Sequence, residues 1–150
     1  MSITKIIRIS TNSNSLCLPI IYCWHIPTVN DWQTLTTTVS ANPNYICNGD
    51  QGYIAKALAS SYDWYTHTND CAIGNNLLTN NATGFNALPA GYRDYTGGAF
   101  GSRRYSAYFW LSSPFGSNAH IRRLGYNLPE VDPYTSSRAN GFSVRCLKTD

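Results

Sequence analysis

The chain has 150 residues, of which 13% are charged and 43% hydrophobic, and its formal net charge is +3. This length predicts a single domain over 1–150 with a real core, and the apolar content excludes a disordered chain. The mild charge without a Lys/Arg run argues against nucleic-acid binding, and no apolar stretch is long enough to insert into a membrane.

The first residues predict a strand or arm, a polar turn and a second apolar strand from Leu16 to Trp24. The polar stretch from Ser10 to Ser15 interrupts the apolar start, so we expect no Sec-type signal peptide. Residues 1–23 are therefore interpreted as an N-terminal lead to the domain.

Two helices are predicted next. Thr28 followed by Asp31 is an acidic capping box, and Trp32, Leu35 and Val39 recur at helical spacing, which predicts a helix over about 29–40. A shorter helix is predicted from about Gln51 to Ser60, with Asp50 as its cap. Residues 61–83 are expected to form a loop anchored by Trp64 and Tyr65.

Short strands are predicted over about 85–88, 105–113, 119–124 and 141–148, with long loops between them. The chain is therefore expected to be an α+β domain with two helices packed on a twisted, mostly antiparallel sheet.

The five cysteines are Cys17, Cys23, Cys47, Cys71 and Cys146. No CxxC pair and no suitably spaced His accompanies them, so we expect no zinc site. The pairs Cys17–Cys23 and Cys47–Cys71 would suit an oxidising compartment, but the odd count favours free thiols. Cys146 is expected to face the core along the last strand.

A ligand-binding surface is predicted near the C-terminus. Residues 101–106 and 114–140 are rich in Tyr, Ser, Asn, Gly and Arg, as antibody-like binding surfaces are, although β-rich proteins also use these residues in solvated loops. Trp110 is expected in the core, with Tyr108 and Ser112 on the opposite face beside side chains from the flanking loops. The candidate residues are Arg103, Arg104, Tyr105, Ser106, Tyr108, Ser112, Phe115, Ser117, Asn118, His120, Arg122, Tyr126, Asn127, Glu130, Asp132 and Tyr134.

We expect no metal, cofactor or catalytic residues. Asn127, Glu130 and Asp132 offer oxygen ligands for calcium, but a solvated acidic loop is the favoured interpretation. The three histidines have no shared spacing, and no Gly-x-Ser-x-Gly motif marks a nucleophile.

Several motifs occur in a characteristic order: Trp24-His25-Ile26-Pro27-Thr28, Asp31-Trp32-Gln33-Thr34-Leu35, Gly84-Phe85-Asn86-Ala87-Leu88-Pro89-Ala90-Gly91-Tyr92-Arg93, Phe109-Trp110-Leu111-Ser112-Ser113, and Gly141-Phe142-Ser143-Val144-Arg145-Cys146. Over residues 24–148 this order resembles the Fibrobacter succinogenes major paralogous domain. The resemblance implies a C-type lectin fold of the formylglycine-generating-enzyme type, as in the variable proteins of diversity-generating retroelements.

The same resemblance implies a non-catalytic module at a virion tail or cell surface that binds a protein or glycan receptor, with about 100–146 as its variable region. One alternative is a structural or adhesin-type surface domain. Another is a degenerate relative of the formylglycine-generating enzymes, which use a C-terminal cysteine pair where this chain has only Cys146.

Overall fold

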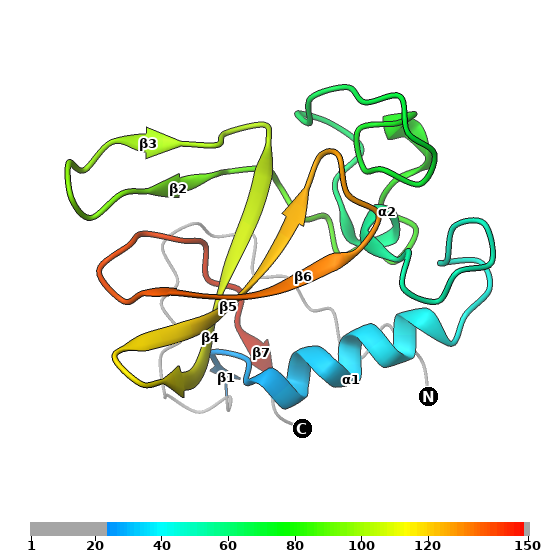
Figure 1. Ribbon diagram of the computed structural model, residues 1–150. Helices are drawn as coiled ribbons and strands as arrows, with labels where there is room; N and C mark the ends of the chain where they lie inside the picture. Colours follow the sequence, from blue (N-terminus) through cyan, green and yellow to red (C-terminus); the bar gives the residue numbers. More distant parts are fainter. Residues whose placement is uncertain (1–23, 149–150) are drawn as a thin grey trace.

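The computed structural model describes residues 24–148, and the strand predicted from Leu16 is therefore described only at Trp24 (Figure 1). The other predictions for residues 1–23, including the pairing of Cys17 with Cys23, lie outside the described residues. The architecture is mixed α+β with antiparallel strand pairs, as the sequence predicts.

The elements follow one another in this order: β1 (Trp24–His25), α1 (Val29–Ser40), α2 (Ala55–Leu58), the 3₁₀ turn η2 (Leu77–Thr79), β2 (Tyr92–Arg93), β3 (Phe100–Gly101), β4 (Ser106–Phe115), β5 (Asn118–Gly125), β6 (Val131–Ser137) and β7 (Leu147–Lys148). Within the described chain β4, β5 and β6 form a three-stranded sheet, while β1 pairs with β7 and β2 with β3. Figure 1 shows the sheet with α1 lying along one side of it and the β2–β3 hairpin projecting to the other.

The predicted first helix is confirmed. The Thr28 hydroxyl accepts from the Asp31 N–H at 3.1 Å, and the Asp31 carboxylate accepts from the Thr28 N–H at 2.8 Å. The Ser113 hydroxyl accepts from the Val29 N–H, so a free donor of the first turn is bonded to β4. Trp32, Leu35 and Val39 are buried, as their spacing predicts.

The core lies between α1, the start of α2 and one face of the sheet. Trp32, Phe85 and Phe109 pack with ring centroids 5.7–5.9 Å apart. The Arg145 guanidinium lies 4.1 Å from the centroid of Phe85 and donates to the Phe85 carbonyl. Burial lowers the pKa of Arg145 to about 10. A cation over two core rings thus joins the last loop to the centre of the domain.

The second helix is shorter than predicted. It spans only Ala55–Leu58, and its N-cap is Ile54 instead of Asp50. Asp50 instead accepts from the Gly52 N–H, and its carbonyl accepts from the Tyr53 N–H, so these residues form turns. Gly52 lies in the first turn of the predicted helix, and glycine disfavours a helix there.

The strand predictions hold in the middle of the C-terminal half and fail around it. β4 and β5 match the predicted strands within two residues, but β6 occupies a segment that was predicted as loop. Residues 85–88 form only an isolated bridge, Ala59 with Ala87. Of 141–148, only Leu147–Lys148 is a strand, because Gly141 and Ser143 bridge to different partners, Arg93 and Phe109.

The predicted orientation of β4 is wrong. Ala107, Phe109 and Leu111 are buried against the core, and Trp110 is only partly buried. Tyr108 shares the outer face with Trp110 and does not lie opposite to it, because alternate residues of a strand point the same way. Ser112 is exposed, as predicted, and its N–H donates to the Pro27 carbonyl.

The prediction of free thiols is also wrong. Cys47 and Cys71 form a disulfide with Cα atoms 5.5 Å apart. Cys146 is disulfide-bonded as well, so it is not a thiol facing the core. The odd cysteine count was therefore a poor guide, since it does not prevent individual pairs from forming.

Candidate ligand-binding site

Three tyrosine rings gather where the loop after α2 meets the beginning of β4 and the end of β5. Tyr65 and Tyr105 are stacked with centroids 4.2 Å apart, and Tyr126 stands edge-on to Tyr105 at 5.3 Å. The Arg104 guanidinium lies 4.8 Å from the Tyr65 centroid, and His67 lies edge-on to Tyr126 at 5.5 Å. We call these five residues the tyrosine–arginine cluster.

Backbone hydrogen bonds fix the cluster from both sides. The Tyr65 N–H donates to the Arg104 carbonyl, and the Tyr126 N–H donates to the Tyr105 carbonyl, both at 2.9 Å. Gly74 then ties the loop to β5, because its N–H donates to the Tyr126 carbonyl and its carbonyl accepts from the His67 N–H. A Cβ on Gly74 would overlap the Tyr65 carbonyl oxygen, so this close approach requires glycine.

The cluster is held by these contacts and is open to solvent. Tyr105 is 43% exposed and Tyr65 39%, although both rings are stacked. Arg104 has φ +67°, a left-handed conformation that costs an arginine about 1–2 kcal/mol. The surrounding hydrogen bonds hold it there, which limits the ordering entropy that a ligand would have to offset.

Asp63 neutralises part of the positive charge beside the rings. Its carboxylate lies 3.5 Å from Arg104 Nε and 3.6 Å from Arg103 Nη2. All three side chains are well exposed, so these contacts orient the guanidinium groups and add little stability. The arrangement offers flat aromatic surface, N–H donors and one acceptor group.

The Tyr105 hydroxyl responds to its neighbours. A side-chain hydrogen bond with Tyr65 raises the pKa of Tyr105, the nearby phenols raise it further, and Arg104 opposes them. The phenol is therefore neutral at physiological pH and acts as a hydrogen-bond donor and acceptor.

The predicted site residues do not form one surface. Arg104, Tyr105 and Tyr126 lie in the cluster, and Arg103 lies beside it through Asp63. Phe115 and His120 contact each other at the far end of the ten-residue strand β4, about 30 Å away along the strand. Ser117 and Asn118 belong to that same distant turn, and Asn127 is exposed just after Tyr126.

Other predicted residues are buried in the sheet or lie away from the cluster. Ser106 and Arg122 are buried, at 8% and 7% exposure, because they lie in the paired interior of the sheet. Tyr134 lies beside Arg123, whose guanidinium is 5.2 Å from its ring. Tyr108 and Trp110 pack on Phe142, at 5.1 Å and 4.7 Å, and cover the outer face of the sheet.

The carboxylates suggested for calcium lie in different surroundings. Asp132 is paired with Arg123 at 2.6 Å, while Glu130 lines a cavity beside α1. Within residues 24–148, no three His, Cys, Asp or Glu side chains come together in a way that could hold a metal ion. In the same range, no helix is both long and apolar enough to cross a membrane.

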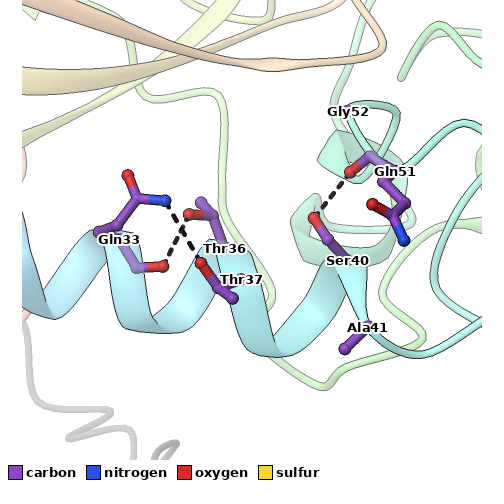
Figure 2. A pocket seen from close by; sticks show the side chains of 7 residues that line it. All are labelled: Gln33, Thr36, Thr37, Ser40, Ala41, Gln51 and Gly52. Atoms are coloured by element: carbon purple, nitrogen blue, oxygen red, sulfur yellow. Dashed lines mark hydrogen bonds between the residues drawn. The ribbon is translucent and has the colours of Figure 1, made fainter.

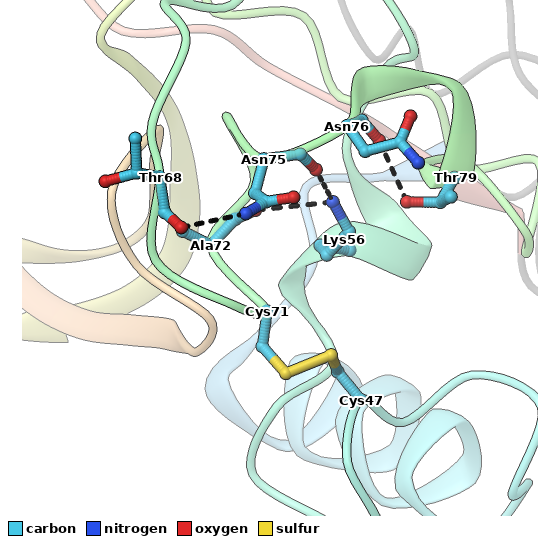
Figure 3. The surroundings of a disulfide bond; sticks show 8 residues. All are labelled: Cys47, Lys56, Thr68, Cys71, Ala72, Asn75, Asn76 and Thr79. Atoms are coloured by element: carbon cyan, nitrogen blue, oxygen red, sulfur yellow. Dashed lines mark hydrogen bonds between the residues drawn. A yellow bond between two sulfur atoms is a disulfide. The ribbon is translucent and has the colours of Figure 1, made fainter.

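The Cys47–Cys71 disulfide lies at the base of the loop that carries Tyr65 and His67 (Figure 3). Beside it, Lys56 Nζ donates to the carbonyls of Ala72 and Asn75, and burial lowers the pKa of this lysine. The loop is therefore fixed covalently at one end and by hydrogen bonds in its middle.

Comparison with known proteins gives one family. The chain matches the Fibrobacter succinogenes major domain over residues 12–148. The chain belongs to this family. No curated protein and no solved structure matches it. In this Fibrobacter succinogenes major domain, the matched segment includes every residue of the tyrosine–arginine cluster.

Sequence reasoning missed the part of the cluster that comes from residues 61–74 of this family member. Tyr65 was expected to be an anchor but is exposed, while Trp64 is the buried residue at 1% exposure. His67 and Asp63 were not among the predicted site residues. The available signal was the Tyr-x-His pattern of Tyr65 and His67, which places both side chains on one side of an extended segment.

Proposed function

We propose that this domain is a non-catalytic binding module that captures a protein or glycan receptor through the tyrosine–arginine cluster. The observation that carries the proposal is the pair of stacked, solvent-exposed rings of Tyr65 and Tyr105 beside Arg104. Tyrosine and arginine are the residues that dominate binding hot spots, and here they are already ordered before any partner arrives.

The finer proposal is a C-type lectin fold that serves as the variable protein of a diversity-generating retroelement, displayed on a virion tail or cell surface. The pairing of β1 with β7, which brings the two ends of the described chain together, supports this fold. Arg104, Tyr105 and Tyr126 fall within the segment 100–146 that would be diversified. The cluster would then combine variable residues with fixed ones from 61–74.

The binding test uses arrays of glycans and of surface proteins. The Tyr65→Ala/Tyr105→Ala double variant should lose binding, because each hot-spot tyrosine contributes about 2 kcal/mol or more, roughly 30-fold in affinity. Tyr95→Ala is the control, since Tyr95 is 56% exposed between β2 and β3 and makes no ring contact within residues 24–148. Equal binding by wild type and the double variant would contradict the proposal.

The genetic test examines the neighbouring DNA for a reverse transcriptase and a near-copy of the codons for about 100–146. The copy should differ from the gene almost only where it carries adenine, with differences at Tyr105 and Tyr126 and identity at Trp110 and Gly141. Differences spread evenly over the four bases would contradict a retroelement origin and leave the receptor test to decide on binding.

A further inference from the structure

Arg122 is a buried cation on the helix side of the sheet. It is only 7% exposed. In the register of the sheet it lies opposite Phe109 of β4 and Pro133 of β6, and Phe109 packs on Trp32 of α1. Arg122 therefore lies beneath α1, away from the tyrosine–arginine cluster.

The guanidinium of Arg122 is poorly satisfied. Among the described residues its hydrogen bonding consists of Nη1 donating to the Ile121 carbonyl at 3.2 Å, and it has no ion pair there. A guanidinium carries five N–H donors and stays charged, so most of its donors have no acceptor among the described residues. Within residues 24–148 no Arg122 nitrogen is both fully buried and without a hydrogen-bond partner, so its unbonded donors reach open space.

These donors face a cavity. A hollow of about 290 Å³ is lined by Arg122, Glu130, Gln51 and residues of α1. It shares Gln33, Thr36, Ser40, Gln51 and Gly52 with a second hollow of about 460 Å³ along α1 (Figure 2). We call the two together the helix groove.

The polar rim of the groove is partly preformed. Ser40 Oγ donates to the Gln51 carbonyl at 2.7 Å, which fixes the backbone at the rim. The Thr36 hydroxyl is used by the Trp32 and Gln33 carbonyls. The Gln51 side-chain amide makes no hydrogen bond with the described residues, so it and Arg122 can both serve a ligand.

We infer that the helix groove binds a small carboxylate, with Arg122 as its charge partner and Gln51 as a second donor. A planar guanidinium matches a carboxylate with two parallel hydrogen bonds. The groove contains one cation and one carboxylate, Glu130, so a doubly charged phosphate is disfavoured relative to a single negative charge. Ile54, Val131 and Pro133 provide an apolar wall for the carbon skeleton.

The test is an NMR titration of the full chain with D-glucuronate, N-acetyl-L-alanine and D-glucose. One or both carboxylates should shift signals of Arg122 and Gln51, and the comparison between them distinguishes an acidic sugar from an N-acylated amino acid. Glucose should shift neither residue. If neither carboxylate shifts these signals up to tens of millimolar, or glucose shifts them equally, the inference is overturned.

Variants locate the binding. Arg122→Met and Gln51→Glu should each weaken carboxylate binding at least tenfold, and Arg138→Met should leave it unchanged, since Arg138 bonds to the distant turn of β4 and β5. Gln51 is exposed, so Gln51→Glu tests the groove without disturbing the core. Unchanged affinity in Gln51→Glu would overturn the assignment.

Stability distinguishes a binding role from a structural one. A buried charge without a partner should be replaceable, so Arg122→Met should melt at or above the wild-type temperature. A fall of several degrees would mean that Arg122 supports the fold, which would overturn its assignment to a ligand. The groove shares no residue with the tyrosine–arginine cluster, so either site can fail its test without the other.

Discussion

Removing the Cys47–Cys71 disulfide should destabilise the domain by an amount that follows from its position. The bond joins residues 24 apart in sequence. Closing a loop of this length removes chain entropy from the unfolded state equivalent to about 3.5 kcal/mol. A domain of this size melts about 2–4 °C lower for each kcal/mol lost, so we expect a decrease of about 10 °C.

The assay is urea unfolding of Cys47→Ala, Cys71→Ala and the double variant, followed by tryptophan fluorescence. Trp64 lies inside the closed loop and is 1% exposed, so it reports on this region. Since either substitution removes the same bond, all three proteins should lose nearly the same free energy of unfolding. Losses that add in the double variant, or that stay below about 1 kcal/mol, would refute the entropic explanation.

Three further outcomes are expected. In a urea titration Phe109→Ala should lower the free energy of unfolding by about 3–5 kcal/mol, because Phe109 is 4% exposed in the core. Trp110→Ala should lower it clearly less, because Trp110 lies on the outer face. Equal losses would contradict the assigned faces. Gly74→Ala should lower the melting temperature and weaken receptor binding, whereas Gly97→Ala, with open space around its Cα, should do neither. Burial raises the pKa of Asp31, but hydrogen bonds from Thr28 and His25 lower it by more and hold it below its usual 3.8. The charged carboxylate therefore stabilises the fold above about pH 4, and this stability is lost as the pH falls through the folded-state pKa. Between pH 2.5 and 5 the melting temperature of Asp31→Asn should change less with pH than that of the wild type. An equal change in both proteins would refute this role.

Local signals predicted the parts of the fold that local interactions determine. The helix at Val29–Ser40 follows from a capping box and apolar residues on one side, and both features are contained within a few turns. The segment at Val131–Ser137 was missed because the composition of residues 114–140 was interpreted as that of a loop, and it also contains Pro133, which is unusual inside a strand. Pro133 is tolerated because β6 lies at the edge of the sheet, a position that only the tertiary structure reveals.

Residue type identified several residues of the candidate site but could not show which of them lie together. Arg104, Tyr105 and Tyr126 were identified from residue type, and Tyr134 and Phe115 were identified by the same criterion although they lie elsewhere. Tyr65 joins the cluster through a hydrogen bond to a residue 39 positions later, the Arg104 carbonyl. No local pattern encodes such a contact, because it depends on how the loop after α2 returns to the sheet.

The neighbouring ends of the described chain have a consequence for protein engineering. Trp24 of β1 is the direct cross-strand partner of Lys148 of β7. Their Cα atoms are therefore only about 5 Å apart, close to the gap that an ordinary surface loop must span. Insertion of the domain into an exposed loop of a host protein would therefore place both junctions side by side and would not force the host backbone apart, provided that the inserted segment keeps the disulfide of Cys146.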